Sequence, residues 1–180
     1  DYNRYIKLPK NISKTKIGFF LGSSIGNFYN KEEKKFLINA KKTLGKKSFL
    51  FVGVDLIKNV KILKKAYNDK KNFTAKFNLN LINILNKQIK TNLKIRDFKY
   101  IATFNRKKGS MENFIKSKKD QFFFIKKHKF YLKKGDKIQT EISNKFTISK
   151  FTKLARSSGW SVKKHWKDAK RYYAVFLLQA

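Results

Sequence analysis

The chain has 180 residues, of which 41% are hydrophobic, so it is long enough and apolar enough to bury a core. It contains no cysteine, which excludes disulfides and thiolate metal sites. It also lacks a run of about eighteen apolar residues that could cross a membrane as a helix. The first ten residues lack the apolar stretch of a signal peptide, so we expect a cytoplasmic protein without membrane partners.

The net charge is +34, and a positive field of this size attracts nucleic acid and anionic lipid. Among the 45 basic residues, however, Arg stands only at positions 4, 96, 106, 156 and 171. Arg, rather than Lys, reads guanine edges and grips phosphate with two parallel hydrogen bonds. The Lys residues are spread along the whole chain instead of forming one stripe. We therefore expect no specific nucleic-acid partner, and a basic nucleic-acid-binding protein remains the alternative from another class.

The first half of the chain predicts a βαβ unit followed by two helices. Lys16–Ser23 and Ser48–Val54 are short apolar runs, typical of strands buried on both faces of a parallel sheet. Between them Lys31–Leu44 has one apolar face and predicts a helix that ends at Gly45. Further helices are predicted over Leu56–Tyr67 and Thr74–Gln88. The residues of the last helix that we expect to face inward are Phe77, Leu81, Ile84 and Leu85.

The second half changes in pattern and then returns to α/β. From Phe98 to Thr140 apolar and polar residues alternate, which predicts an antiparallel subdomain inserted into an α/β frame. Thr147–Ser158 predicts a helix with Ser149 as its cap and Gly159 as its stop. Trp160–Lys167 and Tyr172–Leu178 predict a closing hairpin at a sheet edge. Shorter predicted elements are strands Phe122–Ile125 and Lys129–Leu132 and a turn at Lys134–Asp136.

Three segments carry dense polar groups. Leu21–Phe28 follows the first predicted strand, and ligands of open α/β sheets bind at such carboxyl ends. Ala66–Asn80 begins with a polar cluster at a helix end, and Gln139–Phe146 places Glu141 and Ser143 on one face of an extended segment. Taken singly, the three segments are better explained as an ordinary turn, a helix stop and an edge strand, respectively.

Six short motifs occur in a specific order along the chain. In this order and spacing the chain resembles the histidine-specific N-methyltransferases that make hercynine for ergothioneine biosynthesis. The resemblance covers essentially the whole chain and implies a Rossmann-like class I methyltransferase sheet in residues 1–57 and 148–180, with an inserted α+β substrate-binding subdomain in 58–147. The motifs are LGSSIGNF (21–28), GVDL (53–56), AYND (66–69), FNLN (77–80), TEIS (140–143) and GW (159–160).

The resemblance implies roles for individual residues. Gly22 and Asn27 match the turn that grips the substrate, where Asn27 binds the amino-acid carboxylate together with Tyr67. Glu141 and Ser143 match the pair that hydrogen-bonds the substrate imidazole. A carboxylate and a hydroxyl can read the one N–H and the one bare nitrogen of a neutral imidazole. The expected substrate is therefore L-histidine, whose α-amine receives three methyl groups in turn.

The cofactor implied by the resemblance is S-adenosyl-L-methionine. Asp1 and Tyr2 match a step beside the adenine, so the Gly-rich cofactor loop is expected before residue 1, and the chain is expected to be a C-terminal fragment that binds cofactor poorly alone. No general base and no metal ligand can be named. The state expected is a monomer.

One position departs from the family pattern. In Ser110–Ile115 the chain keeps Glu112 but has Asn113 where the family has a Met that lines the substrate. The departure bears on side-chain specificity, so a methyltransferase for another amino acid or a small amine remains an alternative within the class.

Overall fold

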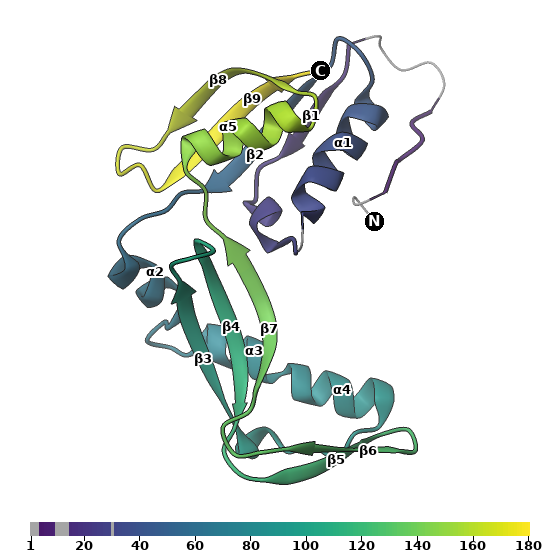
Figure 1. The fold of residues 1–180 in the computed structure, drawn as a ribbon, viewed down its shortest axis with the longest axis vertical. Helices are drawn as coiled ribbons and strands as arrows, with labels where there is room; N and C mark the ends of the chain where they lie inside the picture. Colours follow the sequence, from purple (N-terminus) through teal and green to yellow (C-terminus); the bar gives the residue numbers. More distant parts are fainter. Residues whose placement is uncertain (1–3, 10–14, 30) are drawn as a thin grey trace. The chain divides into compact units, whose positions relative to one another are not determined.

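The computed structural model describes residues 4–9, 15–29 and 31–180. The chain forms two compact units (Figure 1), the first made of Asp1–Lys58 with Ser143–Ala180 and the second of Asn59–Ile142. The second unit is thus one uninterrupted segment, and it lies within the 58–147 range assigned to the inserted subdomain from sequence.

The first unit is built on a four-stranded sheet in the order β1-β2-β9-β8. Strand β1 (Ile17–Phe20) pairs in parallel with β2 (Phe49–Asp55), which confirms the predicted βαβ unit. Strand β9 (Tyr173–Gln179) is antiparallel to β2 and to β8 (Ser161–Lys167). The predicted closing hairpin therefore lies at a sheet edge, and β8 runs in the same direction as β2.

Two helices cover one face of this sheet. Helix α1 (Glu32–Leu44) ends where Gly45 adopts a φ of 82°, as the sequence predicts. Helix α5 (Ile148–Ser157) packs Phe151 and Ala155 into the same core as the apolar residues of α1, β2 and β9. Its cap is Thr147, whose hydroxyl accepts from the Lys150 N–H at 3.1 Å, so the assignment of the cap to Ser149 was wrong. Ser149 lies inside the first turn instead.

On the other face of the sheet the side chains of β1 are exposed, which corrects the prediction that β1 is buried on both faces. Ile17 and Phe19 are 54% and 67% exposed. The Phe19 ring stacks on Phe51 with centroids 5.1 Å apart, and Phe51 lies 6.3 Å from Trp166. The physical reason is that β1 is an edge strand of the described sheet and that α1 and α5 pack on the opposite face.

The second unit combines a three-stranded sheet, a hairpin and short helices. The sheet has the order β3-β4-β7, and the strands expected between Phe98 and Thr140 are present. Leu63, Ala102 and Met111 form one buried cluster of this unit, and Ile82 and Ile115 belong to another. The elements are α2 (Val60–Tyr67), α3 (Phe73–Leu79), α4 (Leu81–Ile89), η2 (Ile95–Asp97), β3 (Phe98–Asn105), β4 (Ser110–Ser117), β5 (Gln121–Ile125), β6 (His128–Leu132) and β7 (Lys137–Asn144).

The helices of this unit differ from prediction in extent and phase. Helix α2 begins at Val60, four residues later than predicted, because Asn59 caps it by accepting from the Lys61 N–H at 2.8 Å. The helix predicted over Thr74–Gln88 is broken at Asn80 into α3 and α4.

The inward face runs on across the break but is offset from the predicted one, so the predicted set of inward residues is partly wrong. Phe77 and Ile84 are 75% and 41% exposed, whereas Ile82 is fully buried.

Candidate functional site

The predicted substrate turn of the first unit follows β1 and contains a short 3₁₀ helix, η1 (Ser24–Asn27). The turn is tied to the end of β2, because the Ser23 hydroxyl accepts from the Asp55 N–H at 2.8 Å. Asn27 is exposed, and no described residue hydrogen-bonds its side chain. A Cβ added to Gly22 would meet only the Ser24 hydroxyl, at 3.4 Å. Both residues are therefore open to a ligand at the carboxyl end of a parallel strand.

The same turn packs against the end of β7. A Cβ added to Gly26 would lie 2.7 Å from the Asn144 carbonyl oxygen and 3.6 Å from Ser143 Oγ, so only glycine fits. The Asn144 side-chain amide donates to the Phe28 carbonyl at 2.9 Å. The first unit thus brings the predicted turn and Ser143 into one neighbourhood, although they are far apart in sequence.

A buried lysine that sequence reasoning missed holds Ser143. The Lys145 ammonium donates to Ser143 Oγ at 2.8 Å, and its residue is only 1% exposed. It forms an ion pair with Asp55 Oδ2 at 2.8 Å, while Lys58 donates to Oδ1 of the same carboxylate at 2.5 Å. In a chain this rich in lysine, nothing in the sequence distinguishes Lys145 from its solvated neighbours.

The second unit brings together three predicted site residues from three segments. The buried Asn113 amide donates through Nδ2 to Glu141 Oε2 at 2.8 Å. Its Oδ1 accepts from the Tyr100 hydroxyl at 2.9 Å, and that hydroxyl also lies 3.2 Å from the Tyr67 carbonyl oxygen. Tyr100 was not predicted, because in the sequence it reads only as one residue of an alternating strand.

Burial, followed by the negative charge of Glu141, raises the pKa of Tyr100 above its ordinary value of 10.0. Tyr100 therefore remains a protonated donor at neutral pH. An Asn113 amide that faces a carboxylate must turn its N–H groups toward it, so its oxygen is left to accept from Tyr100.

Other residues of the same motifs have structural roles. Asp69 accepts from the Phe73 and Thr74 N–H groups at 2.7 and 2.9 Å, which caps α3. These backbone hydrogen bonds lower the pKa of Asp69. Glu112, next to Asn113, accepts from Lys108 at 3.2 Å. For Asp69 the structure supports a residue that caps the start of α3 rather than a ligand.

The predicted site residues fall into two groups. Gly22, Asn27 and Ser143 belong to the first unit, and the second unit holds Tyr67, Asn113 and Glu141. Strand β7 carries Glu141 and Ser143 two positions apart. The convergence of both groups on one histidine stays a prediction. The two residues predicted beside the adenine, Asp1 and Tyr2, lie outside the described residues.

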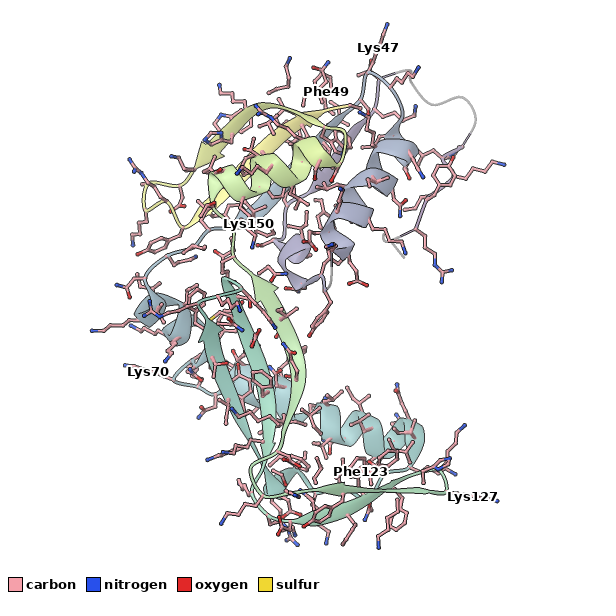
Figure 2. The ribbon with its side chains drawn as sticks, in the orientation of Figure 1. Lys47, Phe49, Lys70, Phe123, Lys127 and Lys150 are labelled. Carbon is pink, nitrogen blue, oxygen red and sulfur yellow. The ribbon has the colours of Figure 1, made fainter. Side chains whose placement is uncertain are left out.

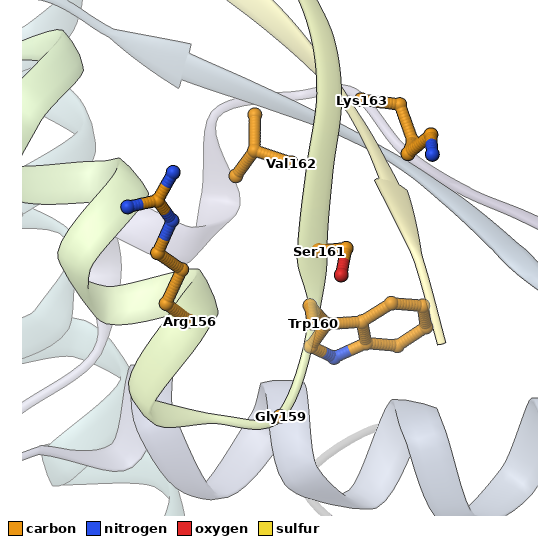
Figure 3. Close-up of a pocket in the computed structure, with 6 residues that line it drawn as sticks. All are labelled: Arg156, Gly159, Trp160, Ser161, Val162 and Lys163. Atoms are coloured by element: carbon orange, nitrogen blue, oxygen red, sulfur yellow. The ribbon is translucent and has the colours of Figure 1, made fainter.

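A hollow of about 600 Å³ lies elsewhere on the first unit (Figure 3). Arg156, Trp160 and Lys163 are among its lining residues. It lies at the start of β8, a strand that runs in the same direction as β2, and therefore at the amino ends of these strands. The turn after β1 and the end of β2, which belong to the candidate site, lie at carboxyl ends. It contains none of the predicted site residues, so we assign it no role.

The cationic side chains do not follow one element (Figure 2). Lys47 precedes β2, Lys70 follows α2, Lys127 connects β5 and β6, and Lys150 lies in α5. Among the described residues, no helix is long and apolar enough to cross a membrane.

The first unit has a mixed sheet with polar groups at the carboxyl ends of its parallel strands, and the second unit is inserted after β2, which defines an α/β protein with an inserted subdomain. The chain belongs to the family of histidine-specific, S-adenosylmethionine-dependent methyltransferases, whose profile matches residues 1–180. This match confirms the resemblance seen in the sequence.

Two curated relatives carry names in line with the family. The chain is 29% identical over 129 residues to the histidine N-alpha-methyltransferase of Mycolicibacterium smegmatis, covering 71% of the chain and 40% of that protein. It is 28% identical over 175 residues to ergothioneine biosynthesis protein 1 of Neurospora crassa, covering 96% of the chain and 20% of that protein. The chain thus spans less than half the length of these relatives.

A solved S-adenosylmethionine-dependent methyltransferase from Clostridium acetobutylicum is also similar to the chain. The comparison covers 99% of the chain and 62% of that structure, at 10% identity and a TM-score of 0.46.

Proposed function

We propose that the chain is part of an enzyme that transfers methyl groups from S-adenosyl-L-methionine to the α-amine of L-histidine and forms the trimethylated betaine hercynine. Family membership supports the reaction class. The observation that carries the substrate is the hydrogen bond of 2.8 Å that holds the Glu141 carboxylate on Asn113, two residues from Ser143 on β7.

Glu141 and Ser143 suit the two ends of an imidazole edge. Glu141 Oε2 is occupied by Asn113, and no described residue donates to Oε1. Oε1 would accept the imidazole N–H, and the Ser143 hydroxyl would donate to the bare nitrogen. A site with both groups rejects side chains that lack them by roughly 10⁴-fold, because its own polar groups would otherwise stay unpaired.

Asn27 and Tyr67 are proposed to bind the α-carboxylate, with Gly22 leaving room for it. The carboxylate fixes the amino acid by its common end, so it orients the amine without selecting the side chain. The Tyr67 ring suits an amine that grows into a trimethylammonium, because aromatic faces attract quaternary ammonium groups. Holding the amine in line with a methyl donor in this way can contribute roughly 7–11 kcal/mol to the barrier reduction.

S-adenosylmethionine, the cofactor of the family, supplies the methyl group in an already activated form. The described residues would act on the amino acid instead: they bind its carboxylate, read its ring and orient its amine. No described residue is assigned as the general base. The finer predictions, a monomer in the cytoplasm without a nucleic-acid partner, are part of the same proposal.

Asn113 supports histidine rather than another amino acid. At this position the family has an apolar Met, but here the amide fixes a carboxylate that would face the ring. An apolar or small amine substrate would leave Oε1 of that carboxylate without a donor in a half-buried site, which is costly. The alternative of a different amino-acid substrate therefore requires one with a hydrogen-bond donor on its side chain.

The test is methyl transfer by the full-length protein from labelled S-adenosylmethionine to each of the common amino acids. We expect label in histidine, with one, two and finally three methyl groups seen by mass spectrometry. Glu141→Ala should weaken use of histidine selectively, whereas Glu33→Ala, which removes a carboxylate from α1, should leave it unchanged. Label that goes to another amino acid, or an unchanged preference in Glu141→Ala, would contradict the assignment.

A further inference from the structure

We propose that Lys145, which orients the Ser143 hydroxyl, and Tyr100, which orients the Glu141 carboxylate through Asn113, together select one tautomer of the histidine ring, although neither would touch the substrate. The inference rests on the proposed function, because it takes Ser143 and Glu141 as the pair that reads the imidazole. Both are positioning residues, and each acts through a different neighbour.

The first device fixes Ser143 as a donor. A hydroxyl can donate once and accept twice, so by itself Ser143 could present either polarity to a ring nitrogen. The Lys145 ammonium has only donors, and it takes one of the two acceptor sites of Ser143 Oγ at 2.8 Å. The hydroxyl proton of Ser143 must therefore point elsewhere, and among the described residues it finds no acceptor. It is left for a bare ring nitrogen.

The ion pair with Asp55 keeps Lys145 in place. Lys145 is 1% exposed, and a buried ammonium is stable only when it is paired and hydrogen-bonded. Asp55 Oδ2 lies 2.8 Å from its nitrogen. Because Asp55 stands at the end of β2 and its N–H binds Ser23 at 2.8 Å, the same residue ties the donor to the predicted substrate turn.

The second device holds the Glu141 carboxylate in one orientation with one oxygen open. The Tyr100 hydroxyl donates to Asn113 Oδ1 at 2.9 Å, which leaves Nδ2 to donate to Glu141 Oε2 at 2.8 Å. Both hydrogen bonds donate in the same direction, from Tyr100 to Asn113 and from Asn113 to Glu141. The carboxylate, which by its nature can only accept, is thereby held in one orientation with Oε1 left open. A donor at one position and an acceptor at the other match a neutral ring whose N–H faces Glu141.

The test compares histidine with two kinds of analogue in the full-length enzyme. Pyrrolylalanines keep a ring N–H but lack the bare nitrogen, and thiazolylalanines keep the bare nitrogen but lack the N–H. Both ring isomers of each are used, so that one isomer presents its nitrogen at the correct position. The readout is the ratio of kcat/KM for histidine to that for the analogue, which a merely structural defect would leave unchanged.

We expect Lys145→Met to lower the histidine-to-pyrrolylalanine ratio about tenfold, the value of one hydrogen bond of ordinary strength, with the thiazolylalanine ratio unchanged. Tyr100→Phe should lower the histidine-to-thiazolylalanine ratio and leave the histidine-to-pyrrolylalanine ratio unchanged. Lys145→Arg keeps a donor-only head and should restore the ratio. The matched controls are Lys153→Met, an exposed lysine of α5, and Tyr131→Phe, a tyrosine of β6 that is 47% exposed.

Equal losses on all substrates in Lys145→Met or Tyr100→Phe would overturn the inference while leaving the proposed function intact. If the wild-type enzyme does not methylate histidine, the proposed function itself fails. Circular dichroism would show whether the Lys145 variants fold. If they do not, the wild-type enzyme still tests the inference, because it should use one pyrrolylalanine isomer better than the other. Equal use of the two isomers would refute a selected tautomer.

Discussion

Replacing Glu141 by Gln should damage histidine recognition as much as replacing it by Ala. Gln is nearly isosteric with Glu, so a site that needs only shape would accept it. In this structure, however, Asn113 donates from Nδ2 at 2.8 Å. The new amide must answer it with its oxygen, and its NH₂ group then occupies the position of Oε1. The imidazole N–H would meet a donor where the wild type has an acceptor.

The magnitude follows from two losses. A hydrogen bond to a charged group contributes about 1.5–3 kcal/mol, and an N–H left facing another donor costs about 1–3 kcal/mol more. Since 1.4 kcal/mol is a factor of ten, kcat/KM for histidine should fall by roughly 10²- to 10⁴-fold. For phenylalanine, which has no ring N–H, the change should be small.

The assay is single-substrate methyl transfer with the full-length enzyme, with stability checked by thermal unfolding. Adding Asn113→Leu to Glu141→Gln frees the amide to rotate, so the double variant should recover part of the histidine activity. A Glu141→Gln enzyme within threefold of wild type on histidine would refute the reasoning, because it would mean that Asn113 does not dictate the polarity of residue 141.

Three further predictions concern stability and titration. Hydrogen bonds from backbone N–H groups, that of Tyr173 first, lower the pKa of Asp168 from 3.8. Their stabilisation is therefore present above that pH and lost as the pH falls through the lowered pKa, and Asp168→Asn should flatten this acid dependence in urea unfolding. Trp160→Phe should lower the free energy of unfolding by roughly 1–3 kcal/mol, because the Trp160 indole N–H donates to a buried carbonyl at 2.9 Å. In the same measurement Trp166→Phe, whose residue is 42% exposed, should change the free energy of unfolding by no more than about 0.5 kcal/mol. Glu141→Gln should lower the pKa of Tyr100 toward its ordinary value but not to it, since burial is the largest cause of the raised pKa. Ultraviolet titration of the phenol, with Tyr100→Phe as the reference, measures this pKa, and an unchanged pKa would contradict the prediction.

Much of the fold was readable from the sequence because local signals agree with it. The apolar runs and the helix between them define the parallel pair β1 and β2, and Gly45 ends α1 as predicted. The failures share one cause: periodicity reports which residues are apolar, not what covers them. Phe19 is apolar but exposed at the edge of the sheet, and Phe77 is exposed because α3 buries the polar Asn78 on its inward face instead.

The candidate site was readable only in part. Glu141, Ser143, Asn27 and Tyr67 were found through short motifs, and the family match supports those motifs. The residues that orient them were not found, because a buried lysine and an exposed one look the same in a chain with net charge +34. The role of Lys145 depends on a tertiary contact with Asp55, ninety positions away, which no local pattern encodes.

The most direct measurement is the ¹⁵N NMR spectrum of ring-labelled histidine bound to the full-length enzyme. We predict two separate ring signals at neutral pH, one from a protonated nitrogen coupled to its hydrogen and one from a bare nitrogen that accepts a hydrogen bond. The protonated signal should broaden in Tyr100→Phe and the bare one in Lys145→Met. Two protonated nitrogens, or a single averaged pair as in free histidine, would show that β7 does not read the ring in this way.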